Sequence, residues 1–131
     1  MIKISRQSDY ALQLILGLSK VPKNEYLSLK KFSTESNISF LFLQKIAMHL
    51  RKAGLIEAAK GSGGGYKLLV DPSNITLRRV IEALDDHAGA AACIRGEFCS
   101  KQDKCTLKPN MSVFNSRVTA LLEQTTIADF R

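Results

Sequence analysis

The sequence lacks tryptophan and holds two histidines, three prolines and three cysteines among its 131 residues. It has no run of about 18 apolar residues, the length that a membrane-spanning helix requires. Its first residues, MIKISRQSDY, lack the apolar stretch of a secretory signal peptide, so we expect a cytoplasmic protein that does not cross a membrane. It offers no nucleophile paired with a base, no paired acids and no Cys-x-x-Cys motif, and we therefore expect no enzymatic activity.

Negative charge is also scarce relative to positive charge. The chain carries 19 Lys and Arg against 12 Asp and Glu, a net charge of +7, which favours a polyanionic partner such as nucleic acid. A hydrophobic content of 45% in 131 residues is enough to bury one core but too little for two domains of ordinary size. We expect one compact domain with an appendage.

Apolar periodicity in the first half of the chain predicts helices at 5–19, 29–36 and 40–53. Ser28 and Ser39 are suitable N-cap residues, and Asn37 can take the left-handed conformation that ends a helix. The turn between the second and third helices is short. This is the geometry of a helix-turn-helix, in which the second helix of the pair enters the major groove of DNA.

The third predicted helix has two different faces. Its inner stripe consists of Leu43, Ile46, Ala47 and Leu50, and Gly54 supplies a stop signal. On the opposite face, amide, cationic and apolar groups of the kind that contact bases and phosphates come together. By periodicity alone, a plain solvated face is the favoured interpretation. The residues of that outer face are Leu41, Gln44, Lys45, Met48 and Lys52.

A β-hairpin is predicted directly after this helix. Strand-like runs at 55–60 and 65–70 flank Gly61-Ser62-Gly63-Gly64, whose glycines take positive φ freely. The glycines do not form a Walker phosphate loop, because a strand follows them and the Gly-Lys-Ser/Thr ending is missing. A hairpin in this position is a wing, and Lys60 and Lys67 beside its tip suit contact with phosphates or a minor groove.

The second half of the chain divides into three parts. Thr76 caps a predicted helix that ends near residue 84, and residues 85–108 have no apolar periodicity. A final amphipathic helix and an apolar tail at 125–130 follow. We expect a DNA-binding domain at 1–85, a cysteine loop at 86–108 and a dimerisation helix with its tail at 109–131, since most oligomers are homomeric. The stripe of the final helix consists of Phe114, Val118, Leu121 and Leu122.

All three cysteines lie in the predicted loop, and five residues separate each from the next. In a reducing cytosol, clustered cysteines are more often metal ligands or redox-active thiols than structural disulfides, and an odd number favours the same interpretation. Arg95, Lys101 and Lys104 put positive charge near the sulfurs, which favours thiolates. Zinc competes for such a site, although structural zinc motifs usually have shorter spacings between cysteines.

Taken together, these residues resemble the winged-helix iron–sulfur transcription regulators typified by IscR and NsrR. The similar motifs are SDYAL, LRKAGLIEAAKGSGGGYKL, ITLRRVIEALD, the evenly spaced cysteines and TTIADF. The resemblance implies a mainly α winged helix-turn-helix with a small β-hairpin wing and a long C-terminal dimerisation helix. It also implies a homodimeric repressor that binds a palindromic DNA operator, with a [2Fe-2S] or [4Fe-4S] cluster that senses nitric oxide, redox state or iron.

The same resemblance implies which residues bind the cluster. Three are Cys93, Cys99 and Cys105, and an iron–sulfur cluster takes four protein ligands. Some members use a histidine three residues after the last cysteine, but Lys108 occupies that position. Others use an aspartate from the first helix of the other subunit, which corresponds to Asp9. On physical grounds alone, a favourable interaction with the helix dipole explains Asp9 equally well.

The resemblance also implies DNA contacts from the start of the recognition helix and from the wing. Gln44 stands where related proteins carry a glutamate, so a different operator sequence is expected. Two alternatives remain at this point: a cluster-free thiol redox switch and a zinc-stabilised interaction module. The predicted DNA-contacting residues are Ser39, Gln44, Lys45, Arg51, Lys52, Lys60, Gly61 and Ser62.

Overall fold

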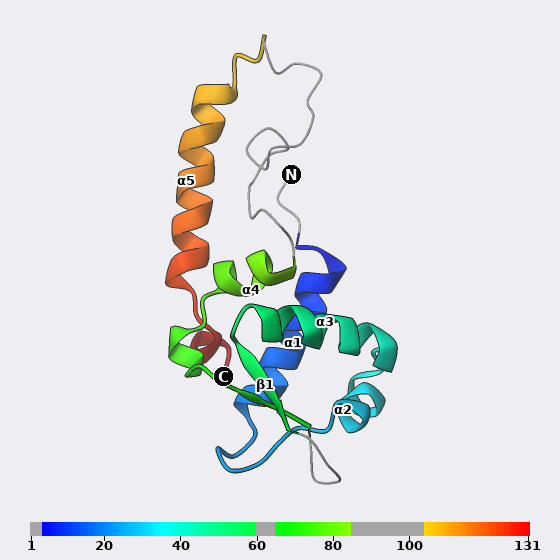
Figure 1. Ribbon diagram of the computed structural model, residues 1–131. Coiled ribbons are helices and arrows are strands. Elements are labelled where there is room, and N and C mark those ends of the chain that lie inside the picture. The colour runs from blue at the N-terminus through cyan, green and yellow to red at the C-terminus, as the bar shows by residue number, and fades with distance from the viewer. Residues whose placement is uncertain (1–3, 60–64, 85–103) are drawn as a thin grey trace.

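Helices and one β-hairpin build the protein, and a long C-terminal helix stands away from the rest (Figure 1). The computed structural model describes residues 4–59, 65–84 and 104–131. This architecture confirms the predicted winged helix-turn-helix with a hairpin and a long final helix. The elements are α1 (Arg6–Ser19), α2 (Leu29–Ser36), α3 (Phe40–Lys52), β1 (Ile56–Ala59), β2 (Gly65–Leu68), the 3₁₀ helix η1 (Pro72–Asn74), α4 (Leu77–Leu84), α5 (Lys108–Gln124) and the 3₁₀ helix η2 (Ile127–Phe130).

Local sequence signals explain most of the helix ends. The hydroxyl oxygens of Ser5 and Ser28 accept hydrogen bonds from backbone N–H groups in the first turns of α1 and α2, at 3.1 and 3.3 Å. Asn37 ends α2 with φ of 60°, the left-handed conformation that was expected. Ser39 precedes α3, but its side chain makes no capping hydrogen bond, contrary to the expectation. At the start of α3 it is the backbone carbonyl of Ser39 that takes part, accepting a hydrogen bond from the N–H of Leu43 at 2.9 Å.

The hydrophobic core lies where α1, α3 and α4 meet the hairpin. The predicted inner stripe of α3 is buried, and it packs against a similar stripe on α1. Full burial of one large aliphatic side chain stabilises a fold by about 1.5–3 kcal/mol. Together these residues fix the orientation of α3. The buried members from α1 and α3 are Ala11, Leu14, Ile15, Leu18, Leu43, Ile46, Ala47 and Leu50.

The hairpin is joined to the loop before α2. β1 and β2 pair antiparallel, with Ile56 opposite Leu68, and Tyr66 forms a further bridge with Leu27. The two backbone hydrogen bonds of that bridge measure 2.8 and 2.9 Å. A Cβ added at Gly65 would lie 2.3 Å from the carbonyl oxygen of Leu27, so only glycine allows this close approach. Both strands are shorter than the predicted runs.

The apolar tail after α5 returns to the core. The side chain of Ile127 is fully buried, and its N–H donates to the carbonyl of Ile75 at 2.9 Å. A bridge between Thr76 and Thr126 runs alongside, and Arg78 of α4 reaches Glu123 of α5 at 2.9 Å. These contacts join the tail, which the predicted boundaries place with the final helix, to the core.

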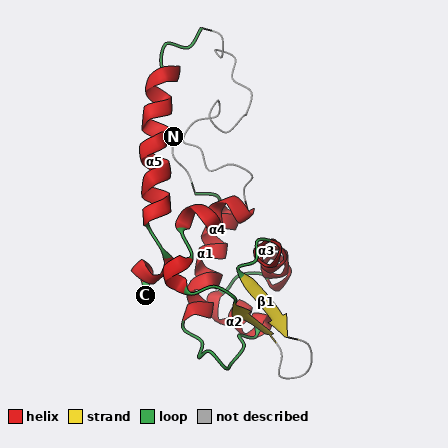
Figure 2. Ribbon diagram, turned by 60° about the vertical axis from the view of Figure 1, so that its left-hand side comes forward, coloured by secondary structure: helices red, strands yellow, loops and turns green. Residues whose placement is uncertain are grey.

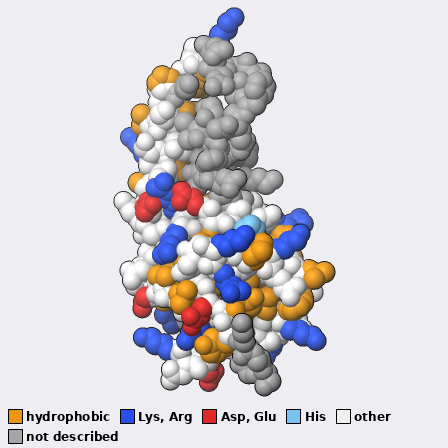
Figure 3. Space-filling view, viewed as in Figure 1, with side chains coloured by type: hydrophobic (Ala, Val, Ile, Leu, Met, Phe, Trp, Pro, Cys, Tyr) orange, Lys and Arg blue, Asp and Glu red, His pale blue; other side chains and the backbone are white. Residues whose placement is uncertain are grey.

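Apolar side chains are left uncovered along α5. With 17 residues the helix is about 25 Å long, and Val113, Phe114 and Leu121 are 56%, 43% and 63% exposed. Figure 2 shows that α5 extends well beyond the globular part, and Figure 3 shows hydrophobic side chains over it. No helix among the described residues is long and apolar enough to span a membrane.

Candidate nucleic-acid interface and metal ligands

The outer face of α3, which the sequence predicts to be the recognition helix, borders a hollow in the surface. The hollow has a volume of about 550 Å³. Three of the predicted DNA contacts, Ser39, Gln44 and Lys45, line it and are solvent-exposed. The structure thus brings a hydroxyl, an amide and an ammonium group together on one face. The apolar members of the lining are Leu41, Phe42 and Met48.

Contacts with α1 hold this face in place. The ring of Phe42 packs edge to face on the ring of Tyr10, with centroids 5.4 Å apart and planes at 83°. Such a pair contributes about 0.5–1.5 kcal/mol beyond its area burial. The ring of Phe42 therefore packs on α1, whereas its neighbour Leu41 faces solvent with 72% of its surface exposed.

Two further predicted contacts, Arg51 and Lys52, lie in the last turn of α3. Both are exposed, and neither lines the hollow. Positive side chains at a helix C-terminus also interact favourably with the helix dipole, which gives them a role in the fold itself. On the face that Figure 3 shows, Lys and Arg side chains are interspersed with hydrophobic ones over the globular part.

The wing is described only in part. Three predicted contacts, Lys60, Gly61 and Ser62, lie outside the described residues. Lys67 on β2 is described, and its Nζ lies 3.0 Å from Glu57 Oε1, its register partner on β1. The same Nζ lies 5.0 Å from the centroid of the Tyr26 ring. The hydrogen bond to Glu57, followed by the interaction with Tyr26, raises the pKa of Lys67 above its ordinary value, so this charge is already engaged within the fold.

Of the four predicted metal ligands, two are described. Asp9 is exposed in the first turn of α1, where its Oδ1 accepts a hydrogen bond from Gln13 Nε2 at 3.3 Å. Cys105 is a half-buried free thiol just before α5. Cys93 and Cys99 lie outside the described residues, and the part of the chain that is described holds no group of three His, Cys, Asp or Glu side chains suited to a metal ion.

Asp9 and Cys105 of one chain lie in different parts of the molecule. Figures 1 and 2 show the segment that leads into α5 at the end of that helix far from the globular part, which contains α1. The structure of a single chain therefore does not bring these two predicted ligands together. A ligand set that includes both requires a second chain.

Comparison with known proteins identifies the protein class. The family model Rrf2, described as an iron-dependent transcriptional regulator, matches residues 4–131. The chain belongs to the Rrf2 family. The regulator NsrR of Halalkalibacterium halodurans is 34% identical to this Rrf2 chain in an alignment of 133 positions that covers 98% of this chain and 89% of NsrR. The regulator IscR of Aliivibrio salmonicida is 29% identical over 122 residues, with 93% of this chain and 73% of IscR covered.

Solved structures agree with this assignment. CymR, the global cysteine regulator of B. subtilis, superposes with a TM-score of 0.81 at 27% identity, covering 99% of this chain and 96% of CymR. IscR of T. potens gives a TM-score of 0.76 at 26% identity, with 98% and 85% covered. The protein is thus an Rrf2-family transcriptional regulator with the winged-helix fold.

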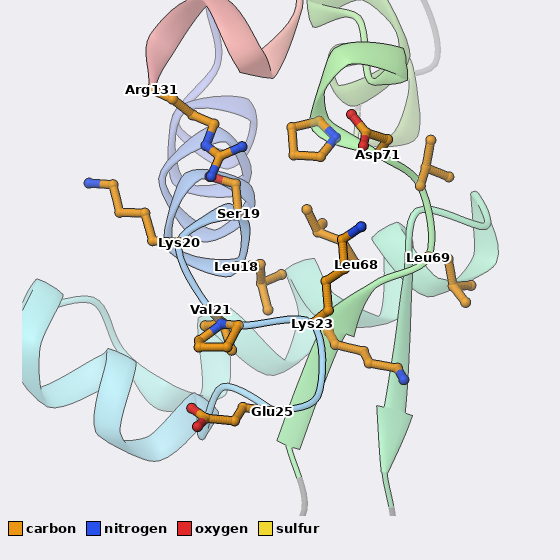
Figure 4. Close-up of a pocket in the computed structure, with 14 residues that line it drawn as sticks. Leu18, Ser19, Lys20, Val21, Lys23, Glu25, Leu68, Leu69, Asp71 and Arg131 are labelled. Atoms are coloured by element: carbon orange, nitrogen blue, oxygen red, sulfur yellow. The ribbon is translucent and has the colours of Figure 1, made fainter.

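A second hollow of about 600 Å³ was not predicted from the sequence of this Rrf2 protein. It lies between the end of α1, the end of β2 and the chain terminus (Figure 4). Its charged lining residues are four basic ones and two acidic ones: Lys20, Lys23, Lys67, Arg131, Glu25 and Asp71. Hydrogen bonds from the hydroxyl and N–H of Ser73, at 2.7 and 2.9 Å, hold the pKa of Asp71 below its ordinary value. The lining thus carries both signs of charge, with an excess of basic side chains.

Proposed function

We propose that this protein is a homodimeric, DNA-binding repressor whose affinity for a palindromic operator is set by an iron–sulfur cluster. The signal is nitric oxide, redox state or iron, and the protein works in the cytoplasm. The observation that carries the DNA-binding part is the exposed outer face of α3, held by α1 and followed directly by a hairpin. Membership of the Rrf2 family and similarity to NsrR and IscR support the regulatory part.

The DNA contacts follow from this face. Gln44 and Lys45 extend from the outer face of α3, where an amide and an ammonium group reach base edges and phosphates in a major groove. Arg51, Lys52 and the wing residues Lys60, Gly61 and Ser62 would add phosphate contacts. A net charge of +7 favours association with a polyanion.

The uncovered side chains of α5 support a homodimer. Val113, Phe114 and Leu121 expose apolar surface on a helix that extends beyond the core. A second copy of the same helix is the partner of matching chemistry, because two-fold dimers bury the same surface from both chains. Such a dimer presents two copies of α3, which explains the expectation of a palindromic operator.

The donor groups fit an iron–sulfur cluster in their chemistry. Cys93, Cys99 and Cys105 would supply three thiolates, the usual ligands of iron, and Asp9 of the partner subunit would supply a carboxylate. The exposure of Asp9 and its distance from the segment before α5 of its own chain support an intersubunit role. When bound, either a [2Fe-2S] or a [4Fe-4S] cluster would supply an iron centre that reacts with oxidants and nitric oxide.

A compositional experiment tests the cofactor. After purification without oxygen, we expect visible absorption together with iron and acid-labile sulfide in the protein. A colourless protein with one zinc and no sulfide would refute the cluster. Asp9→Ala should change the absorption spectrum and speed the loss of iron, while Gln13→Ala, which removes only the hydrogen-bond partner of that carboxylate, should do neither.

A binding experiment tests the DNA-binding part. Phosphate contacts make affinity fall steeply with salt, and base contacts make it depend on sequence. We expect the full chain to prefer a duplex selected from a random library over a scrambled duplex of equal composition at the same salt. Equal affinity for the two duplexes would refute sequence-specific regulation.

A thiol switch without a cluster is the second candidate. The structural similarity to CymR, a global cysteine regulator for which an oxidised form has also been solved from Staphylococcus aureus, favours it. The half-buried free thiol of Cys105 is compatible with it. In that case the protein purified without oxygen would contain no iron, and an oxidant would change DNA affinity through a reversible disulfide.

A further inference from the structure

The outer face of α3, which we propose binds DNA, carries exposed apolar side chains beside its polar ones. Leu41 is 72% exposed and Met48 is 46% exposed, and both line the hollow that also holds Gln44 and Lys45. Single exposed apolar side chains are common on protein surfaces and need no explanation. Here, however, two of them flank the polar groups at the part of the recognition helix that faces base edges, so they can take part in sequence discrimination.

Their spacing suits successive base pairs. Leu41, Gln44, Lys45 and Met48 follow the i, i+3, i+4, i+7 pattern and therefore share one face of α3. Seven residues of α-helix advance by about 10.5 Å, which corresponds to about three base-pair steps of 3.4 Å. Each of these side chains can thus meet a different base pair along the groove.

The side chains on this face of α3 favour contact with an A·T pair. In the major groove, thymine presents a 5-methyl group, and leucine, being purely hydrocarbon, gains by covering that methyl group and loses by covering a polar base edge. Gln44 matches the N6 and N7 atoms of adenine, which pairs with thymine. The hollow contains no carboxylate that would accept a hydrogen bond from cytosine.

From this arrangement we infer that Leu41 recognises the 5-methyl group of a thymine in each operator half-site, next to an A·T pair contacted by Gln44. Met48 covers a second apolar position farther along the same groove. This inference rests on the proposed DNA-binding function and names the bases that the site selects. Lys45, which is long and flexible, contacts a phosphate or a guanine edge beside them.

Replacement of thymine by deoxyuridine tests the inference, because it removes only the methyl group from the DNA. The probe is a duplex selected by the full chain from a random library, with single thymines then replaced. Loss of one buried methyl group corresponds to about a fourfold weaker Kd for one half-site and about fourteenfold for both. We expect this loss at one thymine position in each half-site of the wild-type complex.

The variant Leu41→Ala changes the protein side of the same contact, so that protein and DNA are altered separately and together. It should bind the thymine and deoxyuridine duplexes with equal affinity, because the side chain that covers the methyl group is gone. Leu69→Ala is the matched control, since Leu69 is also exposed, at 53%, but lines the second hollow and not the one on α3. This control should keep the wild-type discrimination. Because Leu41 is on the surface, Leu41→Ala should retain the far-ultraviolet circular dichroism of the wild type.

The outcomes distinguish failure of the proposed DNA-binding function from failure of the thymine inference alone. No preference for the selected duplex over a scrambled one would overturn both the regulatory function and the thymine inference. A clear preference with no sensitivity to deoxyuridine at any thymine would overturn only the inference. An unchanged ratio of the two affinities in Leu41→Ala would also overturn it, by assigning recognition of the methyl group to another residue.

Discussion

The variant Ile127→Ala should strongly destabilise the fold, although the residue lies only four positions from the C-terminus. Its side chain is completely buried in the core cluster. The substitution removes three carbon atoms, worth about 0.8 kcal/mol each in transfer free energy, and the cavity left behind adds to this loss. We therefore expect the free energy of unfolding to fall by about 2–5 kcal/mol.

Urea unfolding followed by circular dichroism measures this loss. With a slope of about 1–3 kcal/mol per molar urea, a loss of about 3 kcal/mol lowers the midpoint by about 1–3 M. The metal-free protein should be used at several concentrations, because ligand binding and dimerisation both shift apparent stability. Phe130→Ala is the control, since Phe130 belongs to the same 3₁₀ helix but is 51% exposed. If the two variants unfolded at similar urea concentrations, the packing of the tail against the core would be contradicted.

Three further substitutions test other parts of the fold. Gly65→Ala should destabilise the hairpin, because its Cβ would clash with the carbonyl of Leu27, and hydrogen exchange of the bridging amides would report the loss. Asn37→Ala should cost about 1–2 kcal/mol in urea unfolding and Asn37→Gly much less, since φ is 60° there. Ser73→Ala should raise the pKa of Asp71 toward its ordinary value in an NMR titration, because one of its hydrogen-bond donors is lost. A depressed carboxyl pKa stabilises the fold above the unfolded-state pKa and loses that effect as pH falls through the folded-state pKa, so this variant should show less acid-dependent loss of stability.

Local signals made most of the helices predictable. Ser28 and Asn37 mark the two ends of α2, and apolar periodicity identified the buried stripe of α3, because these features depend on residues close in sequence. The role of Ile127 was not predictable in this way. The tail is held by the hydrogen bond from Ile127 to Ile75 and by the bridge between Thr126 and Thr76, partners about fifty positions earlier that no local pattern reveals.

In the candidate site, too, the features set by local spacing were predictable and those set by contacts between distant residues were not. Helical spacing was enough to bring Gln44 and Lys45 together on the exposed face of α3. The pairing of Lys67 with Glu57 was missed, although it follows from hairpin register once the two strands are aligned. The cluster ligands remain a prediction from family resemblance, since Cys93 and Cys99 lie outside the described residues.

The contact between Tyr10 and Phe42 joins α1 to the start of α3. Tyr10 directly follows Asp9, so the predicted ligand position on α1 is next in sequence to a residue that touches α3, in addition to the core that the two helices share. Phe42 stands directly beside Leu41 at the start of α3, so the ring contact fixes the end of the helix that carries Ser39, Leu41 and Gln44.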